Sequence, residues 1–325
     1  MRKLFTLMVL LLSCSSLFAQ EWVSIGGNTP DGAKLQLQST DSKGSVFSLS
    51  LNGYFRKQVS TPQGDAWIIS VPKATQIQEA GAPDLPKFAS SFVIPDMARM
   101  GVRVLSSRYE EYTNVLVAPS KGNLLRTVDP ETVPYTFGSI YSEGRLFPGV
   151  EAELRTPHIV RDLRGQTVVV NPFQYNAATK TLRVYYEMTI ELYVIDQNGE
   201  NIISRNGLAH ITPEFNQIYQ NHFLNYSSQG SRYTAVGEEG RMIVIAYGDF
   251  MNTMQPFVEW KNMRGIPTTM VNVSTIGSTS TAIKSYIQNE YDAGGLAYVL
   301  LVGDNAQIPT NSGSGLGGPS DVAYS

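Results

Sequence analysis

Cysteine is almost absent from this 325-residue chain, whose single thiol belongs to Cys14 near the N-terminus. Without the segment that carries Cys14, the chain can form no disulfide and offers no cysteine nucleophile. Charged side chains make up only 16% of the residues, and the formal net charge is −3. No basic cluster is available to follow a phosphate backbone, so the composition argues against nucleic-acid binding.

The chain also lacks an apolar run long enough to span a bilayer. Its longest apolar stretch, Leu4 to Leu12, follows a basic N-terminus and leads into small residues that end at Ala19. This order predicts a signal peptide over residues 1–19, cleaved between Ala19 and Gln20, and therefore a secreted protein without a transmembrane segment. Leu11–Cys14 weakly resembles a lipoprotein box, but the conventional site at Ala19 favours ordinary cleavage.

From Gln20 to about Tyr226 the sequence alternates apolar and polar residues in short runs separated by Pro and Gly. This pattern is typical of an all-β domain, either a sandwich or a barrel-like sheet. Asn176–Lys180 is a predicted hairpin turn that joins Phe173–Tyr175 to the longest strand. Strands are expected at residues 46–51, 66–71, 88–94, 101–105, 114–117, 166–170 and 182–194.

From Gly240 the periodicity changes to alternating strands and helices. Strands are predicted at 242–246, 268–273 and 297–302, and helices at 250–261 and 280–291. Short loops between them predict a parallel sheet with right-handed crossovers. Ligands bind such sheets at the carboxyl ends of the strands, so Asp304 is expected to point toward any cleft.

Several motifs have an ordinary structural interpretation beside a functional one. Gly313–Gly318 matches G-x-G-x-x-G, but it follows the third strand rather than the first, which favours a surface loop over a dinucleotide site. Asp304 and Asp321 are either loop carboxylates or isolated cation ligands, and calcium needs six or more oxygens. The histidines, His158, His210 and His222, lie far apart in sequence and show no ligand spacing.

The segment Ser227–Arg232 is small and polar and separates the two patterns. A flexible connection of this kind is where a protease can bind and cut a backbone. Arg232 is therefore either one exposed basic residue in a linker or a protease recognition residue, and the pattern alone favours neither.

Long motifs in both halves resemble gingipain-type cysteine peptidase precursors. Those of the first half resemble the propeptide and lie at Val117–Gly122, Arg161–Gln166 and Gln174–Arg183. Those of the second half resemble the start of the caspase-like catalytic domain and lie at Gly240–Ile245, Phe257–Gly265, Tyr298–Asp304 and Ser320–Asp321.

The resemblance implies a multi-domain chain: a signal peptide over 1–19, a β-rich propeptide over 20–232 and a truncated α/β, Rossmann-type parallel-sheet domain over 233–325. It makes Arg232 the last propeptide residue and Tyr233 the mature N-terminus. The catalytic His and Cys are expected beyond residue 325, so no catalytic residue is assigned in this segment.

The implied activity is that of a secreted cysteine endopeptidase that cleaves protein and peptide substrates after basic residues, with arginine favoured. The propeptide would act as an intramolecular inhibitor and folding aid, outside or on the surface of a Gram-negative bacterium. The chemistry needs no cofactor. Structural calcium is implied by the family, without ligands that can be named here.

The main alternative from another class is a secreted adhesin or carbohydrate-binding protein whose β domain functions by itself. Aromatic side chains that suit stacking on sugars, though equally suited to a core, are Trp22, Trp67, Tyr185 and Tyr193. A nucleotide-binding enzyme is a third hypothesis, which depends on the glycine motif.

Overall fold

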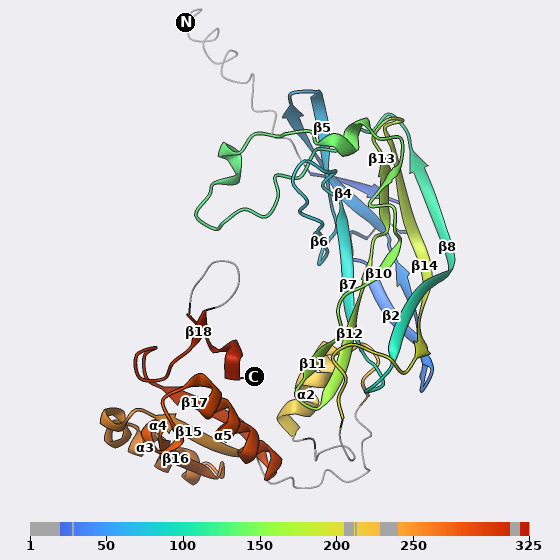
Figure 1. Cartoon of the computed structure of the whole chain (residues 1–325). Coiled ribbons are helices and arrows are strands. Elements are labelled where there is room, and N and C mark those ends of the chain that lie inside the picture. The colour runs from blue at the N-terminus through green and yellow to red at the C-terminus, as the bar shows by residue number, and fades with distance from the viewer. Residues whose placement is uncertain are drawn as a thin grey trace, which may run out of the picture. The chain divides into compact units, whose positions relative to one another are not determined.

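The computed structural model describes residues 20–27, 29–204, 211, 213–227, 240–312 and 319–324. The chain divides into two compact units (Figure 1). The first comprises the residues up to Ser204 together with His222–Tyr226, and the second comprises the remainder. Among the described residues, no helix combines the length and the apolar character needed to cross a membrane.

The first unit consists almost entirely of β-strands, with two short 3-10 turns, η1 (Pro130–Thr132) and η2 (Ser139–Ser142). Its strands are β1 (Glu21–Ser24), β2 (Lys34–Asp41), β3 (Gly44–Ser50), β4 (Gly53–Thr61), β5 (Gly64–Ser70), β6 (Thr75–Gln76), β7 (Pro86–Val93), β8 (Arg99–Tyr112), β9 (Leu146–Phe147), β10 (Ala152–Leu154), β11 (His158–Val160), β12 (Leu163–Val170), β13 (Phe173–Asn176) and β14 (Thr181–Asp196).

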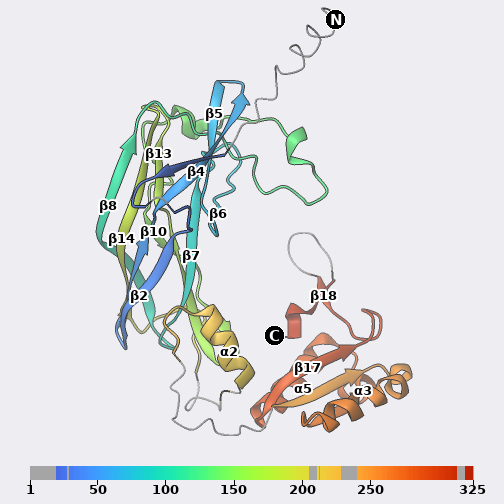
Figure 2. The same cartoon turned by 180° about the vertical axis from the view of Figure 1, so that it is seen from behind.

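Strand β14 is the centre of a six-stranded sheet with the order β2-β3-β14-β13-β9, in which β8 also pairs with β14. Strands β8 and β14 run side by side in Figure 2. One edge of β14 pairs antiparallel with β8 from Leu182 to Asp196. The other edge is shared, because β3 pairs with residues 187–193 and β13 with residues 181–184. The pairing of β13 with β14 confirms the predicted hairpin around Asn176–Lys180.

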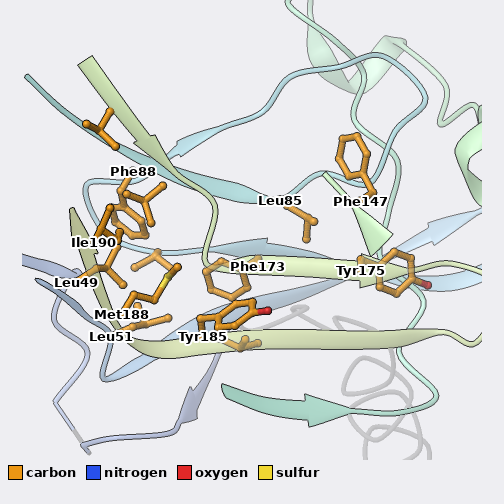
Figure 3. Packing of buried hydrophobic residues seen from close by; sticks show 14 of the residues in the cluster. Leu49, Leu51, Leu85, Phe88, Phe147, Phe173, Tyr175, Tyr185, Met188 and Ile190 are labelled. Carbon is orange, nitrogen blue, oxygen red and sulfur yellow. The ribbon is translucent and has the colours of Figure 1, made fainter. Parts of the chain in front are cut away.

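A five-stranded sheet, β10-β12-β7-β6 with β11 on β12, and a three-stranded sheet, β1-β4-β5, complete the unit. Strand β3 buries every second residue, as expected of a sheet with one apolar face. Side chains from the different sheets pack in one core, seen in Figure 3, so the arrangement is a β-sandwich. Its members include Leu49, Leu51, Phe88, Phe173, Tyr175, Met188 and Ile190.

Most strands expected in this region are present, and the expected strand at 114–117 is wrong. There the chain makes only an isolated bridge between Val117 and Trp67. The sequence also missed β2 and β4, and it ended β8 at Leu105 instead of Tyr112. The second half of β8 is an exposed edge whose side chains are mostly polar, so no apolar alternation marks it.

The second unit contains a three-stranded parallel sheet in the order β16-β15-β17, which confirms the predicted parallel pairing. Ile243 and Ile245 of β15 pack with Ile283, while Met242 and Val244 pack with Val258, so each face is covered by a helix. The elements are β15 (Arg241–Ala246), η3 (Gly248–Phe250), α3 (Met251–Met263), β16 (Thr268–Asn272), α4 (Val273–Ile276), α5 (Ser280–Asp292), β17 (Leu296–Val302), β18 (Asn311–Ser312), β19 (Pro319–Ser320) and η4 (Asp321–Tyr324); α2 (Pro213–His222) spans the boundary between the units.

A buried arginine joins three parts of the sandwich. Arg164 of β12 has no exposed surface, and burial lowers the pKa of its guanidinium. It donates to the carbonyl oxygens of Pro95 and Ala98 at 2.8 Å. On its other side it donates to Glu200 and Asn201, at 2.5–3.1 Å. Carbonyl oxygens therefore solvate a buried positive charge and fix the segment that leaves β14.

We predict that Arg164→Met destabilises the sandwich by about 3 kcal/mol or more, because several buried carbonyls lose their donor at once. The measurement is the urea unfolding curve of the chain without residues 1–19, monitored by tryptophan fluorescence. Arg108→Met is the matched control: Arg108 is an exposed strand arginine that reaches only Glu187, at 3.3 Å. Its loss should change stability by less than about 0.5 kcal/mol, and equal effects of the two variants would contradict the role of Arg164.

Candidate functional site

The carboxyl ends of β15, β16 and β17 form one edge of the parallel sheet, the edge at which ligands bind in such folds. The connection after β15 passes close to the end of β16, because a Cβ at Gly248 would lie 3.1 Å from the Asn272 amide nitrogen. The Asn272 side chain accepts a hydrogen bond from Ser274 N at 3.0 Å and caps α4. Polar backbone and amide groups therefore line this edge.

Asp304 follows β17 at the same edge, as the sequence predicts, but its carboxylate caps a turn. It accepts a hydrogen bond from the Asn305 backbone N at 2.7 Å, and its own amide donates to the Gln307 side chain at 2.6 Å. Asp321 is an exposed residue at the start of η4. Across the residues that the structure describes, no three His, Cys, Asp or Glu side chains gather closely enough to hold a metal ion.

The folded chain brings together two histidines that lie far apart in sequence. His158 of β11 and His222 at the end of α2 have their Nε2 atoms 3.1 Å apart. The two residues are separated by 64 positions, so no local sequence pattern could predict this contact. His210 lies outside the described residues.

We call the segment Ser227–Arg232 the junction. The chain that leads to it is attached to the edge of β7. Leu224 donates its amide to the Ser91 carbonyl oxygen at 2.8 Å. Asn225 accepts from the Val93 amide at 2.7 Å and donates back to the Val93 carbonyl oxygen at 2.9 Å. A side-chain amide thus pairs with a strand as a backbone group would. We call residues Phe223–Tyr226 the docked segment.

The predicted processing residues, Arg232 and Tyr233, lie outside the described residues, as do Ala19 and the glycine motif at 313–318. Gln20 is described, and its amide donates to the Ser70 hydroxyl at 3.0 Å. The structure shows where the chain before Arg232 is held. Hydrogen bonds attach it to the sandwich as far as the docked segment, which ends at Tyr226, six residues before Arg232.

A long exposed connection, residues 121–138, leaves the sandwich and returns to it (Figure 1, green). Its base is closed by three backbone hydrogen bonds among Gly81, Ala82, Ser120 and Gly138, at 2.7–2.9 Å. Gly81 has φ +80°, and a Cβ there would meet Gly138 at 3.2 Å, so this closure requires glycine. We call residues 121–138 the exposed loop.

Arg126 lies on the exposed loop between two exposed apolar neighbours, Leu125 and Val128. Every other arginine in the described parts of the chain contacts a carboxylate, a backbone carbonyl or an aromatic ring. Arg126 contacts none among these residues. Its guanidinium is therefore available to a partner outside the sandwich, a property that nothing in the local sequence reveals.

Asp84 lies near the base of the exposed loop, where its amide bonds to the Ala118 carbonyl oxygen at 3.0 Å. One of its carboxylate oxygens is buried without a hydrogen-bond partner among the described groups. Burial raises the pKa of Asp84 to about 6. Burial is also the main cause that raises the pKa of Tyr135 and Tyr141, and the charge of Asp84 adds to it. The ionised form of Asp84 is therefore unfavourable in the folded sandwich.

We predict that Asp84→Asn removes one source of pH-dependent stability. Because the folded pKa of Asp84 is raised, its contribution is fully present below its unfolded pKa of about 4 and is lost as pH rises through about 6. At pH of about 7.5 the variant should be more stable than the parent chain by about 1–2 kcal/mol, and the gain should vanish near pH 4. Thermal unfolding across this range tests it. Asp31→Asn, at an exposed site, should show no such trend.

Two family models match the chain in succession. The one described as Propeptide_C25 covers residues 25–233, and the one described as Peptidase family C25 covers residues 236–325. The two matches leave residues 234–235 between them, just after the segment Ser227–Arg232.

Curated relatives from Porphyromonas gingivalis are similar over almost the whole chain. A protein named Gingipain R1 is 38% identical over 96% of this chain, and one named Gingipain R2 is 36% identical over 100% of it. A protein named Lys-gingipain is 26% identical over 86%. The chain spans only 31% of that Gingipain R1 and 44% of that Gingipain R2.

A solved structure resembles the first unit. It is a chain from the complex of the pro- and mature domains of RgpB from P. gingivalis, with TM-score 0.55 and 35% identity, and the match covers 59% of this chain and 98% of that one. A sandwich that matches the C25 propeptide, followed by a parallel sheet that matches the C25 peptidase, shows that this chain belongs to the gingipain-type cysteine peptidases of family C25.

Proposed function

We propose that this chain is the front part of a secreted cysteine endopeptidase precursor, in which the sandwich keeps the enzyme latent until the junction is cut. The observation that carries the proposal is the succession of a propeptide match and a peptidase match along one chain. The proposed preference for arginine rests on the relatives: those at 36–38% identity are named Gingipain R, and Lys-gingipain is less similar, at 26%.

The parallel sheet supports assigning residues 233–325 to the first part of a caspase-like domain. In the proposed reaction, a cysteine thiolate attacks the scissile carbonyl and a histidine transfers the protons. Both groups are expected beyond residue 325. Structural calcium remains part of the proposal without assigned ligands, as do secretion through the signal peptide and exposure at the surface of a Gram-negative bacterium.

Arg232 is proposed to occupy the specificity pocket of the enzyme and to mark the cleavage point. A planar guanidinium suits such a pocket because it can donate two parallel hydrogen bonds to one carboxylate. The docked segment limits its reach: six residues of extended chain beyond Tyr226 span at most about 20 Å. Processing within one molecule would therefore require a pocket within this distance of Tyr226.

Arg126 is a second candidate for the inhibitory contact, supported by its exposed position and its lack of a partner among the described residues. The backbone of the exposed loop is anchored at both ends on Gly81, so the arginine is presented by a closed loop rather than by a free end. Arg126 can therefore remain bound after the junction is cut. Cleavage and inhibition would then be assigned to two different arginines.

The adhesin alternative loses its candidate binding residues. Tyr185 is buried in the core, and its hydroxyl donates to Glu151. Trp22 packs edge-on against Phe55 at 4.9 Å. The remaining two rings, Trp67 and Tyr193, are each covered by an arginine guanidinium, at 4.4 and 4.9 Å.

We predict that single alanine variants of the full-length precursor separate the two roles. Arg232→Ala should slow conversion to the mature form by about tenfold or more, the loss expected for a pocket-bound arginine. Arg126→Ala should leave the cleavage position unchanged but release activity before cleavage if this residue supplies the inhibitory contact. The measurements are N-terminal sequencing of the secreted enzyme and hydrolysis of an arginyl peptide by the uncut precursor.

Arg108→Ala, at an exposed sheet position, is the control and should alter neither readout. A mature chain that starts far from Tyr233, or unchanged processing of Arg232→Ala, would refute the assignment of the cleavage point. Full latency in Arg126→Ala together with early activity in Arg232→Ala would leave inhibition with Arg232 alone.

A further inference from the structure

The histidine pair, His158 and His222, connects the sandwich to the chain that leads into the junction. The Nε2 atoms lie 3.1 Å apart and the rings cross at 86°, so one ring donates an N–H hydrogen bond to the Nε2 of the other. His222 is followed directly by the docked segment. Phe223 stacks parallel on His158 at 6.1 Å, with 9° between the ring planes.

The pair depends on a close approach to β12. Gly165 lies opposite His158 in the β11–β12 register. A Cβ at this position would lie 2.4 Å from the Phe223 ring and 2.9 Å from His158 Nε2. The absence of a side chain at Gly165 therefore leaves the space that the histidine pair and Phe223 occupy.

No described carboxylate is paired with either imidazole. On β12 the ionisable residue next to Gly165 is Arg164, whose guanidinium donates hydrogen bonds to backbone carbonyl oxygens. The β11–β12 turn carries Arg161 and Asp162, which pair with each other at 3.4 Å. Charged groups on other neighbouring segments are Lys87 of β7, Asp96 after β7, Glu200 after β14, Arg155, which pairs with Glu153 before β11, and Glu214, about 12 Å along α2 from His222.

We propose that the histidine pair is a proton-sensitive contact that holds the docked segment on β7 when at most one ring is charged, and that double protonation releases this segment and thereby promotes cleavage at the junction. When both rings carry two N–H donors, neither Nε2 can accept, and two like charges face each other at hydrogen-bond distance. The link to cleavage rests on the proposed function, whereas release of the segment does not.

The direction of the pH effect follows from the pKa of His158. Burial first, and the neighbouring His222 second, lower this pKa below its ordinary value of 6.5. The released state therefore binds protons more readily than the docked state. Docking is favoured above pH of about 6.5 and is lost as pH falls through the lowered pKa of His158.

Amide hydrogen exchange on the full chain tests the release directly, with rates corrected for the intrinsic effect of pH. The amides to follow are those of Leu224 and Val93, which bond across the docked segment. Between pH of about 7.5 and 5, their protection should fall at least about tenfold, because double protonation removes the hydrogen bond between the rings and adds repulsion between like charges. His222→Gln and His158→Gln, which retain hydrogen-bonding groups but cannot become charged, should show flat profiles.

Gly165→Ala is the structural control and should lower protection at every pH, because its methyl group displaces the pair. A flat wild-type profile, or a pH response that persists in both glutamine variants, would overturn the proposal. A response abolished by EDTA would overturn it as well, since the rings would then hold a metal ion. Exchange that follows pH in a precursor that is not cleaved near Arg232 would support the contact and count against the proposed function.

Discussion

A buried positive charge that must be solvated by backbone oxygens organises one end of the sandwich. Arg164 draws together the turn after β7 and the segment that leaves β14, because four carbonyl groups accept from one guanidinium. Further backbone bonds, such as Gly199 N to Met97 O, depend on the same alignment. Removing the charge would leave these acceptors without donors, which costs more than the loss of one hydrogen bond.

Arg164 holds the segment after β14, and this segment precedes the docked segment and the junction in the chain. β12 holds Arg164 and, one residue later, Gly165, whose missing side chain admits Phe223 and His158. One strand therefore positions both the exit from β14 and the contact that holds the docked segment. The proposed latency would depend on such attachments, because they fix the position of the chain that leads from the sandwich into the junction.

The described arginines of the sandwich have two kinds of role. Some hold neighbouring strands together through partners in the sandwich, whereas the guanidinium of Arg126 is available to an outside partner. Arg56, Arg103 and Arg183 hold carboxylates of neighbouring strands, and each also lies over an aromatic ring. Arg126 differs because its loop leaves the sheets and provides no such partner among the described residues. Residue type alone does not separate these roles, since all four are arginines in a β-rich sequence.

By itself, the sequence determined the two patterns, their order and the parallel sheet. In the second unit β15 and β17 are largely continuous apolar runs, and α3 and α5 repeat their apolar residues at helical spacing. Local periodicity is therefore sufficient to predict these elements. The second half of β8 and the bridge at Val117 were not predicted, because polar edge residues and irregular pairings produce no periodic pattern. The histidine pair, the charge-solvating carbonyls around Arg164 and the lack of a partner for Arg126 among the described residues were decided only by tertiary structure. Each depends on groups many positions apart in sequence, whose contact is set by how the sheets pack rather than by any local pattern.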